Sequence, residues 1–323
     1  MPMERDVHMR SHGFTTTART LNGAVGASRA FGTFGELLQG VLPDTDLDFL
    51  VTLPIDVWST ARFEVAPPGA PLVVRPSGKY KSLALARTLL ASRGIDHGGT
   101  LVIRSGLPEG KGLASSSADL VATSRAIGDA FDLALTELAI EDLLRPIEPS
   151  DGVMYQGSVA FYHRQTRLRE RLGYLPPLSI VGMDEGGTVP TIAFNRIPKP
   201  FGLADKREYG RLLDTLARAM REKDLESVGE VATRSAVMNQ RLRPKQSLDR
   251  LRHIAGAAGA LGVVSAHSGT FLGVLLAEEE PQYAERLARV RDACRDLTSR
   301  TVLYHSLADP RGSHPFTDRS GHK

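Results

Sequence analysis

The sequence predicts an α+β protein of two lobes, and two observations carry this prediction. Strand-like runs rich in Val, Ile and aromatic residues dominate the first half of the chain, whereas segments with apolar residues at three-to-four spacing dominate the second half. The chain has 323 residues, of which 41% are hydrophobic and 24% charged, as expected for two globular domains or one large two-lobed unit. We place the junction between the lobes near residues 164–177.

The predicted elements lie between two polar tails. Residues 1–27 lack apolar periodicity and are expected to form a disordered tail, and residues 309–323 form a similar polar tail. The N-terminal lobe is expected over residues 28–170 and the C-terminal lobe over residues 171–308. Strands are predicted at residues 50–53, 58–66, 100–104, 153–162, 178–183, 263–266, 272–276 and 301–304. Helices are predicted at residues 79–92, 117–131, 135–144, 206–221, 225–241, 248–261 and 281–299.

Composition excludes several classes of protein. A single cysteine, Cys294, rules out an intrachain disulfide and a zinc site made of cysteines, and its helical context predicts a buried apolar role. The net charge is +3 without any run of basic residues, so nothing indicates a nucleic-acid partner. No stretch approaches the roughly 20 apolar residues of a membrane span, and the first residues lack the apolar centre of a secretory signal. We therefore expect a cytoplasmic protein without a membrane partner.

The segment of residues 107–120, LPEGKGLASSSADL, has the features of an anion-binding loop. It follows an apolar strand-like run and leads into a predicted helix. Gly110 and Gly112 let the backbone turn tightly and approach a ligand closely. The following serines lie where the helix opens, and there the unpaired N–H groups and the positive end of the helix dipole favour an anion.

The same segment also has an interpretation that needs no ligand. Ser116 and Asp119 have the spacing of a capping box, which predicts a helix start whether or not a ligand binds. Because glycine turns and serine caps are common, the segment alone leaves both alternatives open. A P-loop is excluded since Lys111 is followed by Gly112, and the dinucleotide fingerprint is missing as well.

Five segments in a fixed order resemble the GHMP kinases, the group of galactokinase, homoserine kinase and mevalonate kinase. Residues 108–118 resemble the family loop P-x-x-x-G-L-[GA]-S-S-[AS]-[AS]. The other segments are GELLQG at 35–40, LPID at 53–56, IEPSD at 147–151 and AHSGT at 266–270. Together they span most of the chain, from about Phe31 to Leu276, and within the family they look most like the L-threonine kinase branch that serves cobalamin assembly.

The resemblance implies a fold, a cosubstrate and a phosphate site. The expected N-terminal lobe is like domain 2 of ribosomal protein S5, and the expected C-terminal lobe is a ferredoxin-like α+β unit. ATP and Mg²⁺ are the implied cosubstrate and metal. The residues that the resemblance assigns to ATP are Pro108, Gly110, Lys111, Gly112, Leu113, Ala114, Ser115, Ser116 and Ser117.

The resemblance also assigns a general base. Pattern alone favours a turn at Asp151, because Asp-Gly is a common turn pair. In many GHMP kinases, however, an aspartate at this place activates the substrate hydroxyl, so Asp151 is the expected base. The basic residue that many relatives carry in their first motif is replaced here by Phe34 and Gly35, so a partner cation for Asp151 must come from elsewhere, such as Lys111, or be absent.

The metal ligands follow from the chemistry of Mg²⁺, which prefers a few oxygen ligands plus phosphate. Glu148 together with the hydroxyl of Ser116 is the expected pair. Glu141 and Asp142 are alternatives, because they lie nearer the sequence distance at which some relatives place their metal glutamate.

The expected substrate site combines two segments. Glu36 and Gln39 are expected to bind the amino group of an amino acid, with ordinary loop polarity as the alternative. The third family motif contributes His267, Ser268, Gly269 and Thr270, with a structural role as the alternative for the histidine. Separately, Trp58 and Tyr80 are interpreted as core residues, with the wall of an adenine pocket as the alternative.

The resulting hypothesis is an ATP-dependent kinase that phosphorylates the side-chain hydroxyl of free L-threonine to O-phospho-L-threonine, as a monomer or a homodimer. A first alternative keeps the chemistry but takes serine, homoserine or an amino alcohol, since a pocket separates such acceptors by only about 1–3 kcal/mol. A second alternative is a catalytically silent, GHMP-like ligand sensor.

Overall fold

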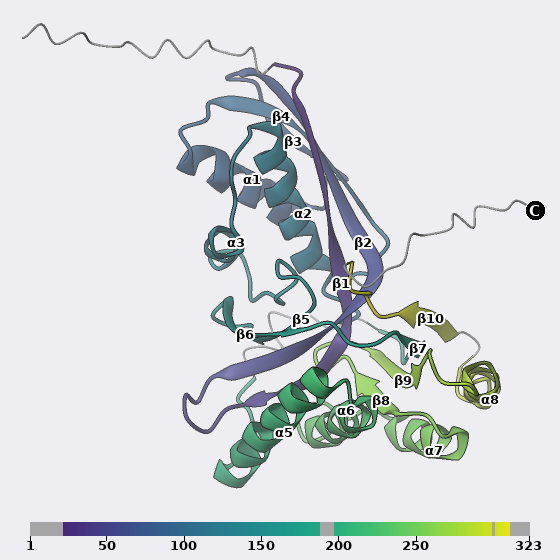
Figure 1. The fold of residues 1–323 in the computed structure, drawn as a ribbon. Coiled ribbons are helices and arrows are strands. Elements are labelled where there is room, and N and C mark those ends of the chain that lie inside the picture. Colours follow the sequence, from purple (N-terminus) through teal and green to yellow (C-terminus); the bar gives the residue numbers. More distant parts are fainter. Residues whose placement is uncertain (1–21, 188–196, 299–300, 311–323) are drawn as a thin grey trace, which may run out of the picture.

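The fold was determined as a computed structural model, which describes residues 22–187, 197–298 and 301–310. Two long antiparallel strands, β1 (Val25–Val41) and β2 (Asp48–Pro68), form its axis and extend through both lobes (Figure 1). The predicted two-lobed α+β architecture is confirmed. Because both lobes share these two strands, a single ten-stranded sheet runs through them in the order β10-β7-β9-β8-β1-β2-β4-β3, with β5 and β6 joined to it through β2.

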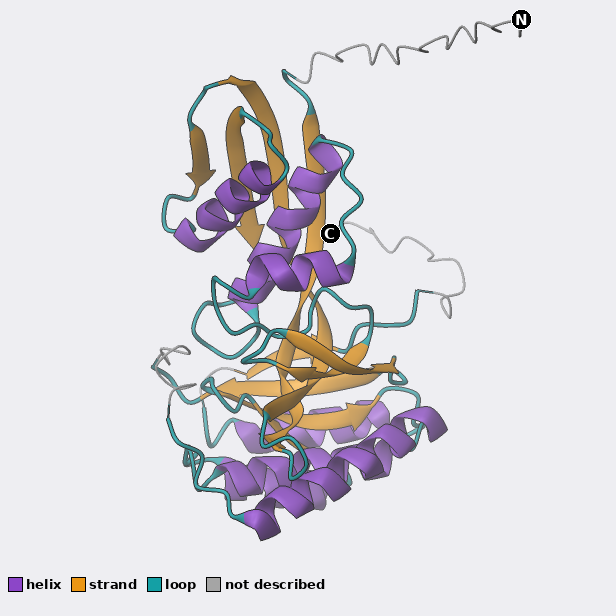
Figure 2. Cartoon of the chain, turned by 90° about the vertical axis from the view of Figure 1, so that its left-hand side faces the viewer, coloured by secondary structure: helices purple, strands orange, loops and turns teal. Residues whose placement is uncertain are grey.

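The N-terminal lobe packs three helices on one face of a four-stranded part of this sheet (Figure 2). The central helix, α2 (Ser115–Ala130), is almost wholly buried against β1 and β2. The contact is so close that a Cβ atom at Gly26 would lie 2.1 Å from the carbonyl oxygen of Ala126, and only glycine is accommodated there. The elements are β3 (Leu72–Arg75), α1 (Tyr80–Ser92), β4 (His97–Ser105), α2 (Ser115–Ala130) and α3 (Glu137–Leu144).

In the C-terminal lobe, α5, α6 and α7 lie below the continuation of the sheet, and α8 lies at its side (Figure 1). A second, smaller core forms where α7 and α8 meet β7, β8 and β9. The strands are β5 (Ser158–Tyr162), β6 (Arg167–Gly173), β7 (Leu178–Asp184), β8 (Gly262–Ser265), β9 (Phe271–Ala277) and β10 (Thr301–His305). The helices are α5 (Leu203–Glu222), α6 (Leu225–Asn239), α7 (Leu248–Ala258) and α8 (Tyr283–Cys294).

Each predicted helix corresponds to a helix of the structure, but three strands escaped prediction. β1 begins at Val25, inside the segment expected to be a tail, and most of its residues are buried, so it lacks the alternation that marks a half-buried strand. β3 has only four residues, and β6 lies in the segment expected to join the lobes. One predicted strand was too long, because the strand expected over residues 153–162 begins only at Ser158. Most of the two predicted tails lies outside the described residues.

The burial of three single residues agrees only in part with the predictions from the sequence. Cys294 is fully buried, as predicted. Trp58 is partly buried, with the guanidinium of Arg29 4.0 Å from its ring centre. The core interpretation of Tyr80 is wrong, because this side chain is 67% exposed at the start of α1. Among the described residues, none of the helices combines the length and the apolar character that crossing a membrane requires.

Candidate active site

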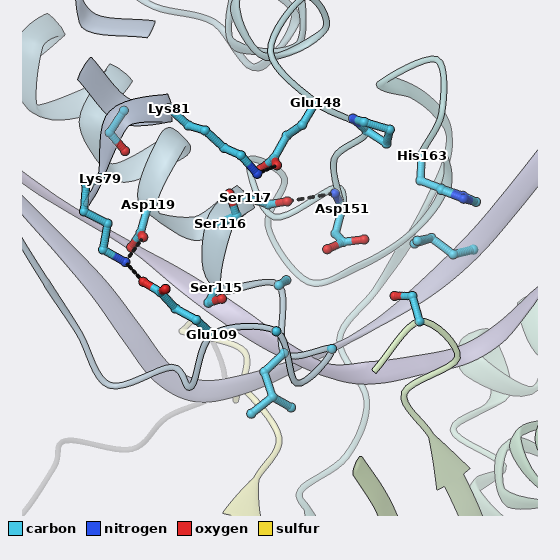
Figure 3. A pocket seen from close by; sticks show the side chains of 18 of the residues that line it. Lys79, Lys81, Glu109, Ser115, Ser116, Ser117, Asp119, Glu148, Asp151 and His163 are labelled. Atoms are coloured by element: carbon cyan, nitrogen blue, oxygen red, sulfur yellow. Dashed lines mark hydrogen bonds and ion pairs between the residues drawn. The ribbon is translucent and has the colours of Figure 1, made fainter. Parts of the chain in front are cut away.

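A cavity of about 350 Å³ opens where α1, the start of α2 and the segment before β5 meet (Figure 3). The predicted site residues that line it are Gly110, Gly112, Leu113, Ala114, Ser115, Ser116, Ser117, Glu36, Gln39, Glu148, Asp151 and Ser268. Five predicted residues are not part of the lining, namely Pro108, Lys111, His267, Gly269 and Thr270. The structure therefore brings segments more than 200 residues apart in the chain to one cavity.

The loop before α2 owes its shape to backbone conformations that disfavour most side chains. Gly110 and Gly112 have φ values of +69° and +83°, and Ala114 has a φ of +55°. Helix α2 begins at Ser115 with Ala114 as its N-cap, and no side chain caps it. The first N–H groups of a helix have no partner within the helix, so this end offers donors to an anion in the cavity.

The predicted capping box is wrong. Asp119 lies in the first turns of α2, yet its carboxylate forms an ion pair with Lys79 at 2.6 Å and accepts a hydrogen bond from Ser59. Lys79 also pairs with Glu109 of the loop. The acidic side chain thus ties the helix to α1 and β2 and leaves the helix N–H groups uncapped.

The third family motif, residues 266–270, packs against the loop before α2. A Cβ atom at Gly112 would lie 2.6 Å from the Cβ of Ala266 and 2.9 Å from the Cα of Gly269. The N–H of Thr270 donates to the carbonyl oxygen of Lys111 at 3.1 Å, and the N–H of Gly35 donates to the carbonyl oxygen of Gly112, also at 3.1 Å. The small residues of this motif are therefore explained by backbone packing against the loop.

Lys111 points away from the cavity. Its Nζ forms an ion pair with Asp184 at 2.6 Å and donates to the carbonyl oxygen of Gly187 at 2.6 Å. Thr270 donates to the same Asp184 carboxylate. Lys111 is therefore not the partner cation of Asp151 in this structure, and within the described segments no ion pair involves Asp151.

Asp151 is held beside the start of α2. Its backbone N–H donates to the Oγ of Ser117 at 3.1 Å, and its carboxyl group points into the cavity (Figure 3). Burial, reinforced by the negative charges of Glu36 and Glu148, raises the pKa of Asp151 to about 7. A carboxyl group with a pKa near neutrality is suited to accept a proton from a hydroxyl.

Glu148 precedes Asp151 by three residues and is buried at the cavity wall. One carboxylate oxygen pairs with Lys81 of α1, while Oε1 has no hydrogen-bond partner. Of the two alternatives for a metal ligand, Glu141 accepts from the hydroxyl of Tyr155 and the N–H of Leu168, both at 2.7 Å, and neither it nor Asp142 lines the cavity. Glu148 is thus the acidic residue whose placement fits a metal beside Ser116.

The opposite wall is a buried hydrogen-bonded chain. Oε2 of Glu36 accepts from the backbone N–H of His267 at 2.9 Å and lies 2.9 Å from its Nδ1. Nε2 of His267 lies 2.9 Å from the Oγ of Ser235, which accepts from the N–H of Gln39 at 3.1 Å. His267 therefore orients Glu36, which corresponds to the structural alternative, whereas Oε1 of Gln39 remains without a partner at the cavity.

Sequence reasoning missed Lys79, Lys81 and His163, all of which line the cavity. The sequence could have indicated the two lysines, because basic residues are unfavourable at a helix N-terminus, and their presence there suggests a function other than helix stability. His163 carried none, since a lone histidine after a strand has no pattern. No group of three or more His, Cys, Asp or Glu side chains that could hold a metal occurs in the described parts of the chain.

Comparisons with known proteins identify the family of the chain. The model of the GHMP kinases N-terminal domain matches residues 80–160, and that of the GHMP kinases C-terminal region matches residues 216–296. The chain is 28% identical to an L-threonine kinase of Citrobacter freundii over 244 residues, which is 75% of this chain and 83% of that protein. It is 27% identical to an L-threonine kinase of Salmonella typhimurium over 278 residues, 84% of this chain and 89% of that protein.

The fold is also similar to that of a homoserine kinase from Cytophaga hutchinsonii, with a TM-score of 0.67 at 16% identity over 94% of this chain and 97% of the other. The resemblance expected from the ordered motifs is confirmed. The two family regions together make up half of the chain and include α2 and most of the residues that line the cavity. The chain belongs to the GHMP kinases, and it is a phosphotransferase that acts on a hydroxyl group with ATP as its cosubstrate.

Proposed function

We propose that this kinase phosphorylates the side-chain hydroxyl of a free hydroxylated amino acid, and that L-threonine is its substrate. The observation that carries the proposal is the juxtaposition of an uncapped helix start with a carboxyl group of raised pKa in one cavity. Similarity to two proteins named L-threonine kinase supports the choice of amino acid.

In the proposed reaction, the N–H groups at the start of α2 bind the β- and γ-phosphates of ATP. Asp151 accepts the proton of the substrate hydroxyl while the oxygen attacks the γ-phosphorus and the bond to the ADP oxygen breaks. Phosphoryl transfer depends mainly on positioning and charge neutralisation, so changes in the loop that binds the phosphates should slow the reaction even if a base is not needed.

The residues present fit a magnesium ion. Oε1 of Glu148 is buried without a partner, and the hydroxyl of Ser116 lines the same cavity. These two oxygens would hold the ion together with phosphate oxygens. When bound, the metal would neutralise charge on the transferred phosphoryl group.

ADP release with a panel of acceptors tests the proposal. We expect turnover with L-threonine above that with serine, homoserine, mevalonate and sugars, and a phosphomonoester product by ³¹P NMR. A preference for serine or homoserine would correct the substrate but keep the reaction. If ATP binds and none of the acceptors is phosphorylated, the chain is a ligand sensor and the proposal fails.

A further inference from the structure

His163 is a buried polar side chain without a protein partner at the cavity. It follows β5 directly, is 3% exposed, and has no hydrogen-bond partner at Nδ1 or Nε2. In Figure 3 it lies beyond Asp151, at the end of the cavity away from Lys79 and Asp119. Because buried polar atoms normally have partners, two unpartnered ring nitrogens in a residue that lines a cavity indicate a ligand.

His163 remains neutral at physiological pH. Burial, together with the positive charges of Lys199 and Arg164, lowers the pKa of His163 to about 3. A neutral imidazole has one N–H donor and one acceptor nitrogen. The backbone of the same residue is fixed, because its carbonyl oxygen accepts from the N–H of Ser150 at 3.0 Å, next to Asp151.

The positive charges of Lys199 and Arg164 act on this end of the cavity. Asp48 pairs with Arg164 at 3.2 Å and with Lys199 at 3.7 Å, so one carboxylate faces two cations. Nε and Nη2 of Arg164 are buried without a hydrogen-bond partner. Burial lowers the pKa of Lys199 and raises that of Asp48, because both groups lose solvation of their charged form.

Acidic and hydrogen-bond-accepting groups line the same cavity. Glu36 and Asp151 are acidic, and the free oxygen of Gln39 is an acceptor. The cavity therefore combines acceptors with a donor that lies near two cations. A zwitterionic amino acid has the complementary arrangement, whereas an amino alcohol or a sugar lacks the anionic group.

We propose that His163 donates a hydrogen bond to the α-carboxylate of the substrate, and that Arg164 and Lys199 supply the compensating charge behind it. This inference rests on the proposed function and adds that the enzyme selects its substrate by the carboxylate. The amino group would then lie toward Glu36 and Gln39, and the side-chain hydroxyl toward Asp151.

The first test compares acceptors with the unaltered enzyme. 1-Aminopropan-2-ol keeps the amine and hydroxyl of threonine but lacks the carboxylate, and L-threonine amide replaces the carboxylate by a neutral group. Loss of a hydrogen bond to a charged group predicts a kcat/KM about 10- to 100-fold lower for both. Equal use of 1-aminopropan-2-ol and L-threonine would overturn the inference and leave the kinase reaction intact. Lack of turnover with every acceptor would instead overturn the proposed function.

The second test changes the histidine. His163→Leu should raise the KM for L-threonine about 10- to 100-fold and leave the KM for ATP unchanged. Its activity on 1-aminopropan-2-ol should equal that of the wild-type enzyme. His163→Asn keeps an N–H donor and should restore part of the selectivity. His253→Leu, on the exposed face of α7, is the matched control and should change neither constant.

Binding of a non-hydrolysable ATP analogue, measured by calorimetry, shows whether His163→Leu is folded. If it binds the analogue and retains the wild-type KM for L-threonine, His163 does not contact the carboxylate and the inference is wrong. If it does not fold, His163→Asn and the comparison of acceptors decide the question.

Discussion

The two ends of the cavity are built in different ways. The proposed phosphate end is made from the backbone of one continuous segment, Gly110 to Ser117, whose glycines and serines would allow the main chain to approach a ligand. The proposed amino-acid end is made from side chains of separate elements, including Gln39 of β1 and His163 after β5. In this proposal, a ligand that many enzymes share would be bound by a contiguous backbone motif, whereas the substrate would be bound by residues that only the fold brings together.

Asp151 lies between the two ends, and its removal should have the largest effect. Asp151→Asn keeps the shape of the side chain and the backbone hydrogen bond to Ser117 but cannot accept the proton. We expect kcat to fall by about 10²- to 10⁴-fold, with little change in the affinity for ATP or L-threonine. Steady-state kinetics and calorimetry measure the two effects separately. Near-normal turnover would show that the reaction needs no base.

The pH profile of the unaltered enzyme gives an independent control. Asp151 must be ionised to accept a proton, and its pKa in the free enzyme is about 7. The value of kcat/KM should therefore rise with pH up to about 7 and level off above it. The residual activity of Asp151→Asn should lack this dependence.

Gly112→Ala should damage the phosphate end alone. The new methyl group would meet Ala266 and Gly269, and a φ of +83° is unfavourable for alanine. Strain of this kind costs about 1–3 kcal/mol of stability, and displacement of the loop should raise the KM for ATP. The KM for L-threonine should change little. An equal rise in both constants would contradict the independence of the two ends.

Gly256→Ala is the matched control for this variant. Gly256 lies on α7 with open space around it and ordinary helical φ, so alanine should leave the kinetics unchanged and stabilise the helix slightly. Loss of activity in both glycine variants would point to a general loss of folded protein.

The contrast between the ends also explains what the sequence could predict. The phosphate loop and Asp151 each lie in a short contiguous motif that resembles a family motif, so both could be predicted as site residues without any knowledge of the fold. The place of His163 in the cavity depends on which strands and helices become neighbours, and no local pattern encodes that. The missed strand β1 has a related cause, because its glycines serve close contacts with α2 and the third motif and interrupt the expected alternation of side chains.

Ser116→Ala should change the metal dependence with a smaller effect. If the Ser116 hydroxyl is a ligand, the Mg²⁺ concentration for half-maximal rate should rise about tenfold, as expected for one lost contact to a charged group. Ser115→Ala, in the same turn of α2, is the matched control and should leave the titration unchanged. An unchanged curve for Ser116→Ala would remove this hydroxyl from the metal site.

The smallest expected effect concerns stability and follows from the same carboxyl group. The pKa of Asp151 is about 7 in the folded protein and 3.8 when unperturbed, so folding favours the protonated form. Its contribution is most favourable below pH 3.8, declines as the unfolded chain ionises, and reaches its minimum above pH 7. Asp151→Asn should therefore melt a few degrees above the wild type at pH 8, with a much smaller difference at pH 4.5. Thermal melts at the two pH values measure this difference, and a larger gain at pH 4.5 than at pH 8 would mean that Asp151 is not held in the protonated form at the boundary between the two ends.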